Sequence, residues 1–441
     1  STLPGDRDFN FRVKAEKESY LLRVSRPDEE EAILDFQTAL LKYVANTGNL
    51  AHSPIPVSDI VGNDISEIID KNGLVRKVRL LTWIEGRLWS AINPINDDLL
   101  FSLGEQAGTL CKALQDFDHP NAHRKCEWDL AEAAWTGDYL HLFPPDQQAI
   151  LSYFQILHKN LPDSYHKLRK SVVHNDVNNN NIVVTDALRN PQVKALIDYG
   201  DAIHTQTIHD LAIAVAYAMM HKSDPLSSAL SVISGYHSAF PLLEEELPFL
   251  YVLIAMRLIT SVTKSAIAKQ NEPENAYLVS SEQAAWGVLE KWIDVSEEFA
   301  HYSFRDACGY TPHPHEYSFE NWAKKQTVSF SSIFPTIKKE IIHLLDLSVS
   351  STWIGHQEEF NDLAFFQFKI DQLQAKVPDS MIAGGYLEPR PIYTSSAYDK
   401  KGNNGNESRT IHLGVDFWLP VNTPVHALFD GTIVTAVVDE G

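Results

Sequence analysis

A set of polar residues in the middle of the chain has the types needed for phosphoryl transfer. It comprises His174, Asp176, Asn181 and Asp198. Asn181 follows Asp176 by 5 residues and precedes Asp198 by 17, and apolar segments flank these positions, which predicts a loop between strands. One carboxylate can orient and deprotonate a hydroxyl, while an amide oxygen and a second carboxylate can hold Mg²⁺ on nucleotide phosphates. The spacing therefore favours phosphoryl transfer.

A purely structural interpretation of these residues is also open. Asn and Asp favour turns, and residues 178–181 are consecutive asparagines, as a polar hairpin turn would have. The His-x-Asp pair and the two spacings from Asn181 favour the catalytic interpretation over the turn.

Residues 172–201 resemble the signature of aminoglycoside phosphotransferase-like kinases, the group that contains choline, homoserine and hydroxylysine kinases. The resemblance covers about residues 1–310, and residues 114–130 and 209–217 look closest to the hydroxylysine-kinase branch. It implies that Asp176 is the catalytic base and that His174 supports the catalytic loop. Asn181 and Asp198 are the implied Mg²⁺ ligands, and Asp210 is the implied anchor of the loop.

The same resemblance implies where ATP or GTP binds. Residues 5–11 look like the family's nucleotide-covering loop, and residues 78–86 resemble its hinge, where the backbone meets the base. Arg23 stands where the phosphate-binding strand residue is commonly Lys, and Arg can hold phosphate through a bidentate fork. Asp35 is aligned with the usual Glu partner on the following helix, and Glu31 lies one turn earlier. The nucleotide-binding residues implied are Asp8, Phe9, Asn10, Arg23, Asp35, Thr82, Trp83 and Ile84. A solvated edge-strand charge is the alternative for Arg23.

Three residues near these motifs could line the acceptor site: Asp201, Trp128 and Asp129. An amino-alcohol substrate carries a cation, which suits an acidic pocket lined by aromatic rings. The alternative is that Trp128 belongs to the core and Asp129 caps a helix.

A second pattern lies near the end of the sequence. His412-x-Gly-x-Asp416, followed by Asp430-Gly-Thr-Ile-Val434, resembles the opening of lysostaphin-type zinc metallopeptidases. The resemblance implies that His412 and Asp416 bind Zn²⁺. That family takes a third ligand from a later segment, so we expect no peptide hydrolysis from this segment alone. A structural role in packing is the alternative for the pair.

A kinase followed by a lysostaphin-like segment resembles bacterial fusions that continue into a class III aminotransferase-like module. We therefore expect further C-terminal domains in the full-length protein, but no pyridoxal phosphate in these residues.

The order of strand-like and helix-like patterns along the sequence predicts an α+β, bilobal protein-kinase-like fold. Short alternating strands come first, with a hairpin turn at Asn72-Gly73, and helical periodicity follows. Residues 330–346 are expected to form one more helix. The predicted divisions are a kinase N-lobe (1–84), a kinase C-lobe (85–310), a helical or irregular connector (311–408) and an all-β metallopeptidase-like fragment (409–441).

Composition limits the functional classes. The 441 residues carry a formal net charge of −21, which opposes binding to nucleic-acid polymers or anionic membranes. No stretch approaches about 18 consecutive apolar residues, so we expect no membrane span. The 3 cysteines are widely separated, which fits a reducing cytoplasm.

The leading hypothesis is a Mg²⁺- and nucleotide-dependent kinase for a small hydroxyl substrate, such as an amino alcohol, a hydroxy amino acid or an aminoglycoside. A non-catalytic pseudokinase that organises fused enzymes is the second hypothesis, and a zinc peptidase is the third. The oligomeric state is left open.

Overall fold

The computed structural model describes residues 1–3, 8–16, 18–48, 50, 52–271, 281–338, 341–353, 355, 362–391, 399–402, 405–408 and 410–433. The chain divides into two compact units, Ser1–Glu316 and Tyr317–Gly441. The catalytic motif lies in the first unit, and the metallopeptidase-like pattern lies in the second.

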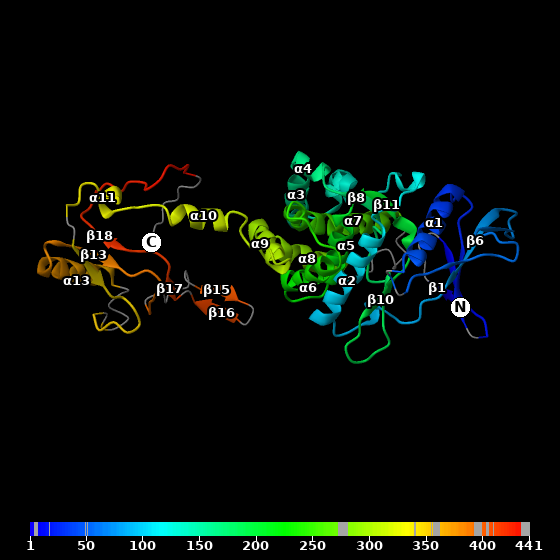
Figure 1. Ribbon diagram of the computed structural model, residues 1–441, viewed down its shortest axis with the longest axis horizontal. Helices are drawn as coiled ribbons and strands as arrows, with labels where there is room; N and C mark the ends of the chain where they lie inside the picture. Colours follow the sequence, from blue (N-terminus) through cyan, green and yellow to red (C-terminus); the bar gives the residue numbers. More distant parts are fainter. Residues whose placement is uncertain are drawn as a thin grey trace. The chain divides into compact units, whose positions relative to one another are not determined.

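The first unit begins with an antiparallel sheet in the order β1-β2-β3-β6-β4, with β5 paired to β6 (Figure 1). Helix α1 buries one face, which includes Leu34 and Phe36, and ends at Gly48, whose φ of +66° suits glycine at a helix C-terminus. The elements are β1 (Thr2–Leu3), β2 (Phe9–Lys14), β3 (Ser19–Val24), α1 (Glu31–Thr47), β4 (Pro56–Val57), β5 (Ser66–Ile69) and β6 (Val75–Thr82).

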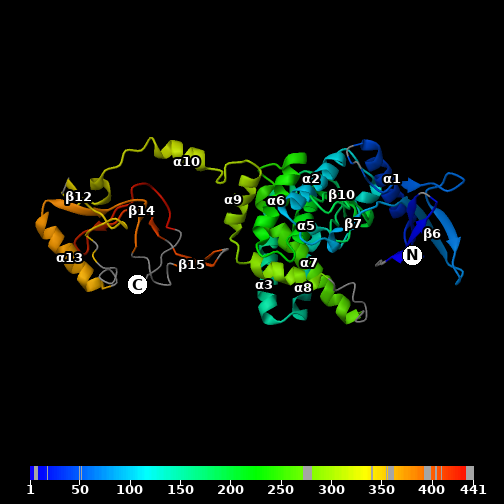
Figure 2. The same ribbon diagram turned by 90° about the horizontal axis from the view of Figure 1, so that it is seen from below.

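Residues 83–86 lead from this sheet into a larger, mainly helical part (Figures 1 and 2). Its helices are α2 (Asp97–Ala113), α3 (Pro145–Lys159), α4 (Asp163–His166), α5 (Ile208–Ala218), α6 (Pro225–Ala239), α7 (Leu250–Asn271), α8 (Glu282–Trp292) and α9 (Glu297–Ala307). The 3-10 helices are η1 (Trp89–Ala91), η2 (Pro120–Ala122), η3 (Leu130–Leu142), η4 (Tyr199–Asp201) and η5 (Leu247–Phe249). The short strands are β7 (Arg87–Leu88), β8 (Lys170–Val173), β9 (Ile182–Val184), β10 (Val193–Leu196) and β11 (Ile203–Gln206).

Two small sheets in the helical part fix the strands around the catalytic motif. One has the order β10-β9-β7, and the other pairs β11 with β8. Gly86 lets the incoming chain approach β9 closely, since a Cβ at this position would lie 2.5 Å from the carbonyl oxygen of Val184. The loop between β8 and β9 is therefore held at both ends by strand pairing.

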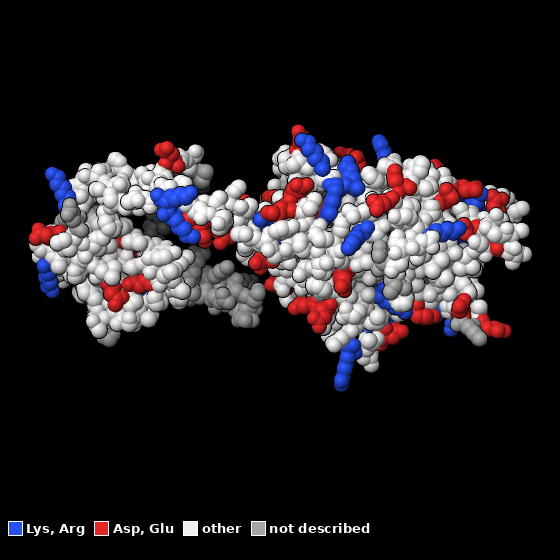
Figure 3. All heavy atoms as spheres, viewed as in Figure 1, with Lys and Arg blue, Asp and Glu red and all other residues white. Residues whose placement is uncertain are grey.

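The core of the first unit lies around α5 and α7. All residues of α5 are buried, and so is most of the N-terminal half of α7. The segment Leu247–Asn271 is long and apolar enough to cross a membrane, but 83% of its most apolar window is buried inside the protein, as expected for a core helix. On the face drawn in Figure 3, acidic and basic side chains are interspersed over this unit.

The second unit contains a parallel pair of strands that the sequence did not predict. β12 and β13 pair in parallel with α13 between them in the chain, and β18 pairs antiparallel with β13. Its elements are α10 (Glu316–Ala323), α11 (Phe330–Ile333), β12 (Ile341–Leu345), α13 (Leu363–Lys376), β13 (Ser380–Gly384), β14 (Glu388–Pro389), β15 (Asp399–Gly402), β16 (Gly405–Ser408), β17 (Ile411–His412) and β18 (Phe417–Trp418).

This pairing corrects two expectations for the C-terminal part. Residues 330–346 do not form one helix, because Ile341–Leu345 is a strand; a short apolar run suits either element, and the partner β13 decides between them. The predicted boundary at 408/409 does not separate two units either, since β13 pairs with β18 and β14 pairs with β17 across it. Residues 434–441 of the predicted fragment lie outside the described residues.

Candidate active site

The loop between β8 and β9 is anchored by one buried carboxylate. The backbone N–H groups of His174 and Asn175 donate to Asp210 at 2.8 and 2.7 Å. Asp210 lies in the first turn of α5 and is fully enclosed, and burial raises the pKa of its carboxyl. Asn175 has a φ of +64°, which turns the chain so that both N–H groups reach the same residue.

His174 supports the same loop from inside, where it is fully buried. Its Nε2 lies 3.1 Å from the carbonyl oxygen of Ile197, and its Nδ1 lies 3.2 Å from the backbone nitrogen of Asp176. Only the tautomer with the proton on Nε2 satisfies both contacts, since Nδ1 must accept from the N–H. The ring therefore ties the loop to the segment that precedes Asp198.

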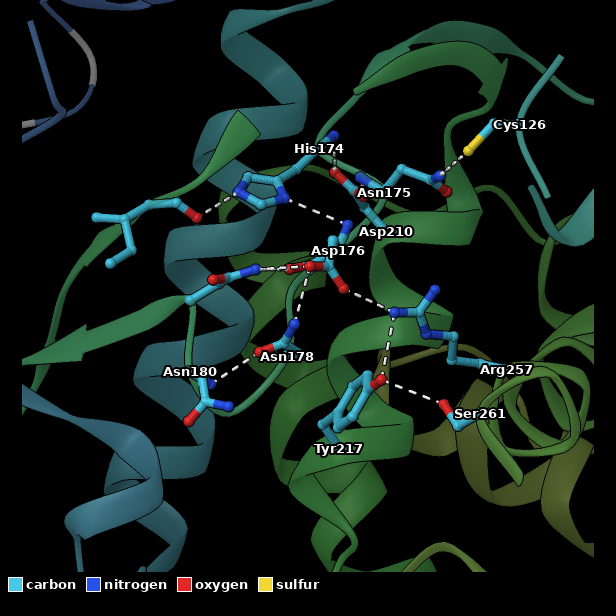
Figure 4. Close-up of polar contacts among 12 residues, drawn as sticks. Cys126, His174, Asn175, Asp176, Asn178, Asn180, Asp210, Tyr217, Arg257 and Ser261 are labelled. Atoms are coloured by element: carbon cyan, nitrogen blue, oxygen red, sulfur yellow. Dashed lines mark hydrogen bonds and ion pairs between the residues drawn. The ribbon is translucent and has the colours of Figure 1, made fainter. Parts of the chain in front are cut away.

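Asp176 is held by donors from two directions (Figure 4). Its Oδ1 accepts from Nη2 of Arg257 at 2.7 Å. Its Oδ2 accepts from Nδ2 of Asn178 at 2.8 Å and from Nδ2 of Asn181 at 2.7 Å. The side chain keeps 18% of its surface exposed, so the carboxylate can still meet a substrate.

Asn181 uses its side-chain amide nitrogen within the loop. Its amide nitrogen donates both to the carboxylate and to the backbone oxygen of Asp176, at 2.7 and 2.9 Å. The amide oxygen accepts no hydrogen bond among the described residues, which leaves it available for a cation.

Asp198 and Arg23 meet across the two parts of the first unit. Nη1 of Arg23, on β3, donates to Oδ1 of Asp198 at 2.8 Å, and its Nε donates to Asp8 at 3.2 Å. Burial alone would raise the pKa of Asp198, but the guanidinium outweighs this and lowers it. Burial opposes the charge of Arg23 in turn, yet Asp198 and Asp8 raise its pKa. The predicted phosphate-binding residue and one predicted metal ligand thus form a direct ion pair.

The predicted pairing of Arg23 with Asp35 is wrong. The Asp35 side chain is 69% exposed and lies 3.5 Å from Nε2 of His119. The polar residue that α1 directs toward the site is Gln37, which accepts from Arg79 at 2.8 Å and donates to the backbone of Gly200 at 3.3 Å. Asp35 lies on the solvent face because the apolar residues that bury α1 occupy the opposite face.

Replacing Asp35 with asparagine should therefore change nucleotide-dependent turnover by less than about twofold, since exposed ion pairs contribute little. Replacing Asp8 with asparagine removes a direct partner of Arg23 and should raise the KM for the nucleotide. Steady-state kinetics on both variants checks the contrast. A larger effect from Asp35 than from Asp8 would contradict the placement described here.

Two of the three residues predicted to meet the base use their backbone donors within the protein. The Thr82 N–H donates to the oxygen of Ile55 at 2.9 Å, and the Trp83 N–H donates to the oxygen of Ser19 at 3.1 Å. Ile84 is the residue of the predicted three whose N–H has no acceptor among the described residues. Of the three predicted residues, Ile84 is therefore the one whose N–H is left to donate to a base.

The predicted nucleotide-covering loop is only partly described, because residues 4–7 lie outside the described residues. Phe9 is exposed, and its ring lies 5.4 Å from the guanidinium carbon of Arg76. Asn10 is opposite Arg23 in the β2–β3 register, and its side-chain oxygen is buried without a hydrogen-bond partner among the described residues.

The three predicted substrate residues separate into different roles. Asp129 accepts from the Ala131 N–H at 3.0 Å and from the Thr205 hydroxyl at 2.9 Å, so it caps η3 as the structural alternative proposed. Burial would raise the pKa of Asp129, but the hydrogen bond from His209 outweighs this and lowers it. Asp129 is therefore not placed to bind a substrate.

Asp201 and Trp128 are linked more closely than Asp129 to Asp176, the proposed base. Burial and the charge of Asp176 raise the pKa of Asp201 to about 6, and Arg257 partly opposes this shift. The Trp128 ring stacks on Arg257, with the guanidinium carbon 4.5 Å from the ring centre. Arg257 thus contacts both Asp176 and Trp128, and Asp201 feels the charges of Asp176 and Arg257.

Sequence reasoning missed Arg257, which touches the proposed base directly. It was detectable in principle, because it is an isolated charge within the apolar segment Leu250–Ile259, and a charged residue in such a helix is rarely buried unless paired. Its partner could not be identified from the sequence.

The His412–Asp416 pair of the second unit does not fit a catalytic zinc site. Nε2 of His412 lies 3.4 Å from Oδ1 of Asp416, but the other carboxylate oxygen is 2.6 Å from the buried Arg390. The described residues include no group of three or more His, Cys, Asp or Glu side chains that could hold a metal. A guanidinium on the same carboxylate opposes a second cation there.

Comparison with known proteins gives a family match for the first part of the chain. Residues 1–241 match the model of the phosphotransferase enzyme family. The chain is 26% identical to a hydroxylysine kinase of Xenopus laevis over 326 residues, which cover 67% of this chain and 85% of that protein. It is 25% identical to a hydroxylysine kinase of Bos taurus over 324 residues, with the same shares covered.

Solved structures share the fold of the first unit. A microcompartment-associated aminopropanol kinase superimposes with a TM-score of 0.53 at 18% identity, covering 67% of this chain and 92% of that one. The amicoumacin kinase hAmiN, solved with AMP-PNP, Ca²⁺ and amicoumacin, gives a TM-score of 0.51 at 17% identity, covering 66% and 87%. These neighbours have the bilobal kinase-like fold with mixed helices and sheets that the sequence predicted.

Proposed function

The chain belongs to the phosphotransferase enzyme family, and we propose that its acceptor is the hydroxyl of an amino alcohol or a hydroxy amino acid. It is a small-molecule kinase, a phosphotransferase that acts on a hydroxyl group. The donor is a nucleoside triphosphate, ATP or GTP, and the reaction takes place on the loop between β8 and β9.

The convergence of Asp176, Asn181 and Asp198 with Arg23 supports this proposal most strongly. Asn181 donates to the carboxylate of Asp176 at 2.7 Å, and Asp198 lies 2.8 Å from Arg23. A hydroxyl-orienting carboxylate, oxygen ligands for a divalent cation and a phosphate-binding guanidinium are the parts that phosphoryl transfer requires. A pseudokinase that had lost catalysis would not need all of these parts.

Mg²⁺ suits the two oxygen donors of this site. Asn181 offers its side-chain amide oxygen, while the amide nitrogen of the same side chain already donates to Asp176. Asp198 offers a carboxylate that is 44% exposed and has a lowered pKa. Hard oxygen ligands of this kind are those that Mg²⁺ prefers. When bound, the ion would neutralise charge on the nucleotide phosphates, and the nucleotide would bring the remaining oxygens.

The transfer step follows from the residues themselves. Arg23, held beside Asp198 by their ion pair, binds a phosphate oxygen of the nucleotide. The substrate oxygen forms its bond to the γ-phosphorus while the bond from phosphorus to the β–γ bridging oxygen breaks, and the nucleoside diphosphate leaves with that electron pair. The hydroxyl proton passes to Asp176. Because the transition state of this transfer is loose, Asp176 acts mainly by orienting the hydroxyl.

The substrate class rests on Asp201 and on the relatives. Hydroxylysine, which the Xenopus laevis and Bos taurus relatives carry in their names, has both a hydroxyl and an ammonium group. Asp201 lies near Asp176 and has a pKa of about 6, so it is negatively charged at neutral pH and can pair with an ammonium group. We propose that Asp201 holds the amine of the substrate.

This role predicts a pH dependence. Burial and Asp176 raise the pKa of Asp201 to about 6; Asp198 acts in the same direction, Arg257 and Arg124 oppose it, and the Cys126 thiol also faces the carboxylate. A raised carboxyl pKa means that Asp201 is neutral below about pH 6 and charged above it. The kcat/KM for an amine-bearing substrate should therefore fall as the pH drops through about 6.

The Asp201→Asn variant should lack this acidic limb and should show a low kcat/KM at every pH. A pH series of initial rates with an amino alcohol and with an amine-free alcohol of equal length measures the effect. An unchanged acidic limb in Asp201→Asn would show that Asp201 does not bind the amine.

The proposed reaction can be tested by a screen for nucleoside diphosphate release. Amino alcohols, hydroxy amino acids and aminoglycosides are offered with MgATP and with MgGTP, and Asp176→Ala serves as the inactive control. We expect acceptor-dependent release with an amino alcohol or a hydroxy amino acid. Release that does not depend on any acceptor would contradict the proposal.

We further propose a cytoplasmic location, because the reaction consumes a nucleoside triphosphate. The lysostaphin-like resemblance of residues 409–441 and the further C-terminal domains that it implies stay predictions. Since Arg390 occupies the carboxylate of Asp416, we propose no peptidase activity for the second unit.

A further inference from the structure

We propose that Arg257 is the positioning residue that selects which oxygen of Asp176 receives the substrate hydroxyl. The inference rests on the proposed function, because it concerns the same reaction. It begins from the hydrogen bonds that Asp176 already makes and asks where a hydroxyl can still be accepted.

The donors around Asp176 leave one acceptor position. A carboxylate offers about four lone-pair positions, two on each oxygen. Oδ2 uses both of its positions, for Asn178 at 2.8 Å and for Asn181 at 2.7 Å. Oδ1 uses one of its positions, for Nη2 of Arg257 at 2.7 Å. The substrate hydroxyl must therefore donate to Oδ1, the same oxygen that Arg257 holds.

Arg257 is itself fixed on several sides (Figure 4). Its Nη2 also donates to the Tyr217 hydroxyl at 3.2 Å, and that hydroxyl lies 3.2 Å from Ser261 on α7. The guanidinium carbon lies 4.5 Å from the centre of the Trp128 ring and 5.3 Å from that of Tyr217. The rings of Trp128 and Tyr217 and the Tyr217 hydroxyl therefore hold the guanidinium, and with it the orientation of the Asp176 carboxylate.

The burial of Arg257 is costly for the fold, which indicates that the position serves more than stability. The residue is 1% exposed, and its Nε and Nη1 atoms are buried without a hydrogen-bond partner among the described residues. A buried donor without a partner is destabilising, and an apolar side chain of similar size would avoid that cost. Among the contacts described for Arg257, the hydrogen bond from Nη2 to Asp176 is the one made to the proposed base.

The charge of Arg257 also suits the kind of catalysis that Asp176 performs. A guanidinium on Oδ1 makes a charge-assisted hydrogen bond, which fixes the direction of the carboxylate more firmly than a neutral donor would. A loose phosphoryl transfer requires an oriented hydroxyl more than a strong base. Arg257 therefore acts through Asp176 and lies beside the attacking oxygen.

The test compares Arg257→Met, Arg257→Lys and the matched control Arg305→Met. Arg305 is also buried, at 4% exposed, and binds one carboxylate, Glu244, at 2.7 Å, but it lies on α9 and touches no residue of the site. Arg257→Met should lower kcat by about a hundredfold, because a misplaced reacting group costs about that much, with KM for nucleotide and acceptor within about threefold. Arg257→Lys should restore part of kcat, and Arg305→Met should keep it.

Thermal denaturation separates stability from catalysis in these variants. Arg305→Met should lower the melting temperature with kcat unchanged, whereas Arg257→Met should lose kcat even where it remains folded. If Arg257→Met does not fold, Arg257→Lys and Tyr217→Phe provide the test, and both should lower kcat more than KM.

Three results would overturn the inference. Arg257→Met could keep kcat within a few-fold of the native value, or it could change only KM. In either case a normal loss of activity in Asp176→Asn would leave the proposed function standing. Full turnover in Asp176→Asn would overturn both the proposed function and the role of Arg257.

Discussion

Replacing Asp176 with asparagine should lower phosphoryl transfer by about a thousandfold while leaving nucleotide binding in place. The neutral amide keeps a single acceptor oxygen with two lone pairs, so it cannot accept from Arg257, Asn178 and Asn181 together as the carboxylate does. It also cannot take up the hydroxyl proton. The loss should therefore appear in kcat, and the KM for the nucleotide should change little.

The matched control for this prediction is Asp186→Asn. Asp186 follows β9, the strand that leaves the catalytic loop, and is exposed, so the same chemical change there should leave turnover unaltered. Steady-state rates and a melting curve are measured for both variants. A folded Asp176→Asn protein with native kcat would contradict the assignment of the base.

Replacing Asp198 with asparagine should abolish the stabilisation of the protein by Mg²⁺ and nucleotide together. The variant loses a proposed metal ligand and the 2.8 Å ion pair that holds Arg23 near the phosphates. Turnover should fall by about a hundredfold or more, as for loss of a charge-stabilising group in a transition state. Thermal shift with Mg²⁺ and ATP or GTP, each alone and combined, measures the binding part of the effect.

Asp70→Asn provides the control for Asp198. Asp70 forms a comparable pair with Arg76, at 2.6 Å, in the turn that precedes β6 and away from the catalytic loop. That variant should keep the full shift with Mg²⁺ and nucleotide. If Asp198→Asn also kept it, Asp198 would not bind the metal. If the native protein showed no shift at all, the pseudokinase hypothesis would replace the kinase.

The elements of the first unit were largely predictable from residue patterns. The Asn72-Gly73 turn predicted the hairpin that the structure shows as β5 and β6, and Gly73 has the positive φ of +78° that such a turn requires. The apolar runs around residues 172 and 183 predicted the strands β8 and β9. Local patterns were sufficient for β5 and β9 because each pairs with the next strand along the chain.

The catalytic loop was predictable for the same reason, and the residues around it were not. Asp176 and Asn181 stand on one loop, so their spacing alone brings them together. Arg257 is 81 residues away from Asp176 and reaches it only through the packing of α7. That contact depends on tertiary structure, which residue spacing does not specify.

The Asp35 error shows how sensitive a helix face is to position. Gln37 lies two residues further along α1 and therefore points in a different direction, toward Arg79. Burial and the neighbouring Arg23 lower the pKa of Arg79 to about 10, so the polar contact from Gln37 stabilises a crowded pair of cations. An acidic residue was expected at this face, and the ion pair of Arg23 with Asp8 and Asp198 replaces it.

Identification of the reaction product tests the central claim most directly. The protein is incubated with Mg²⁺, a nucleoside triphosphate and hydroxylysine or a related amino alcohol, and the acceptor is analysed by mass spectrometry and ³¹P NMR. We expect an acceptor that has gained one phosphoryl group as an ester of its hydroxyl, in amounts equal to the nucleoside diphosphate formed. Nucleoside diphosphate accompanied only by inorganic phosphate, with every acceptor unmodified, would contradict the claim.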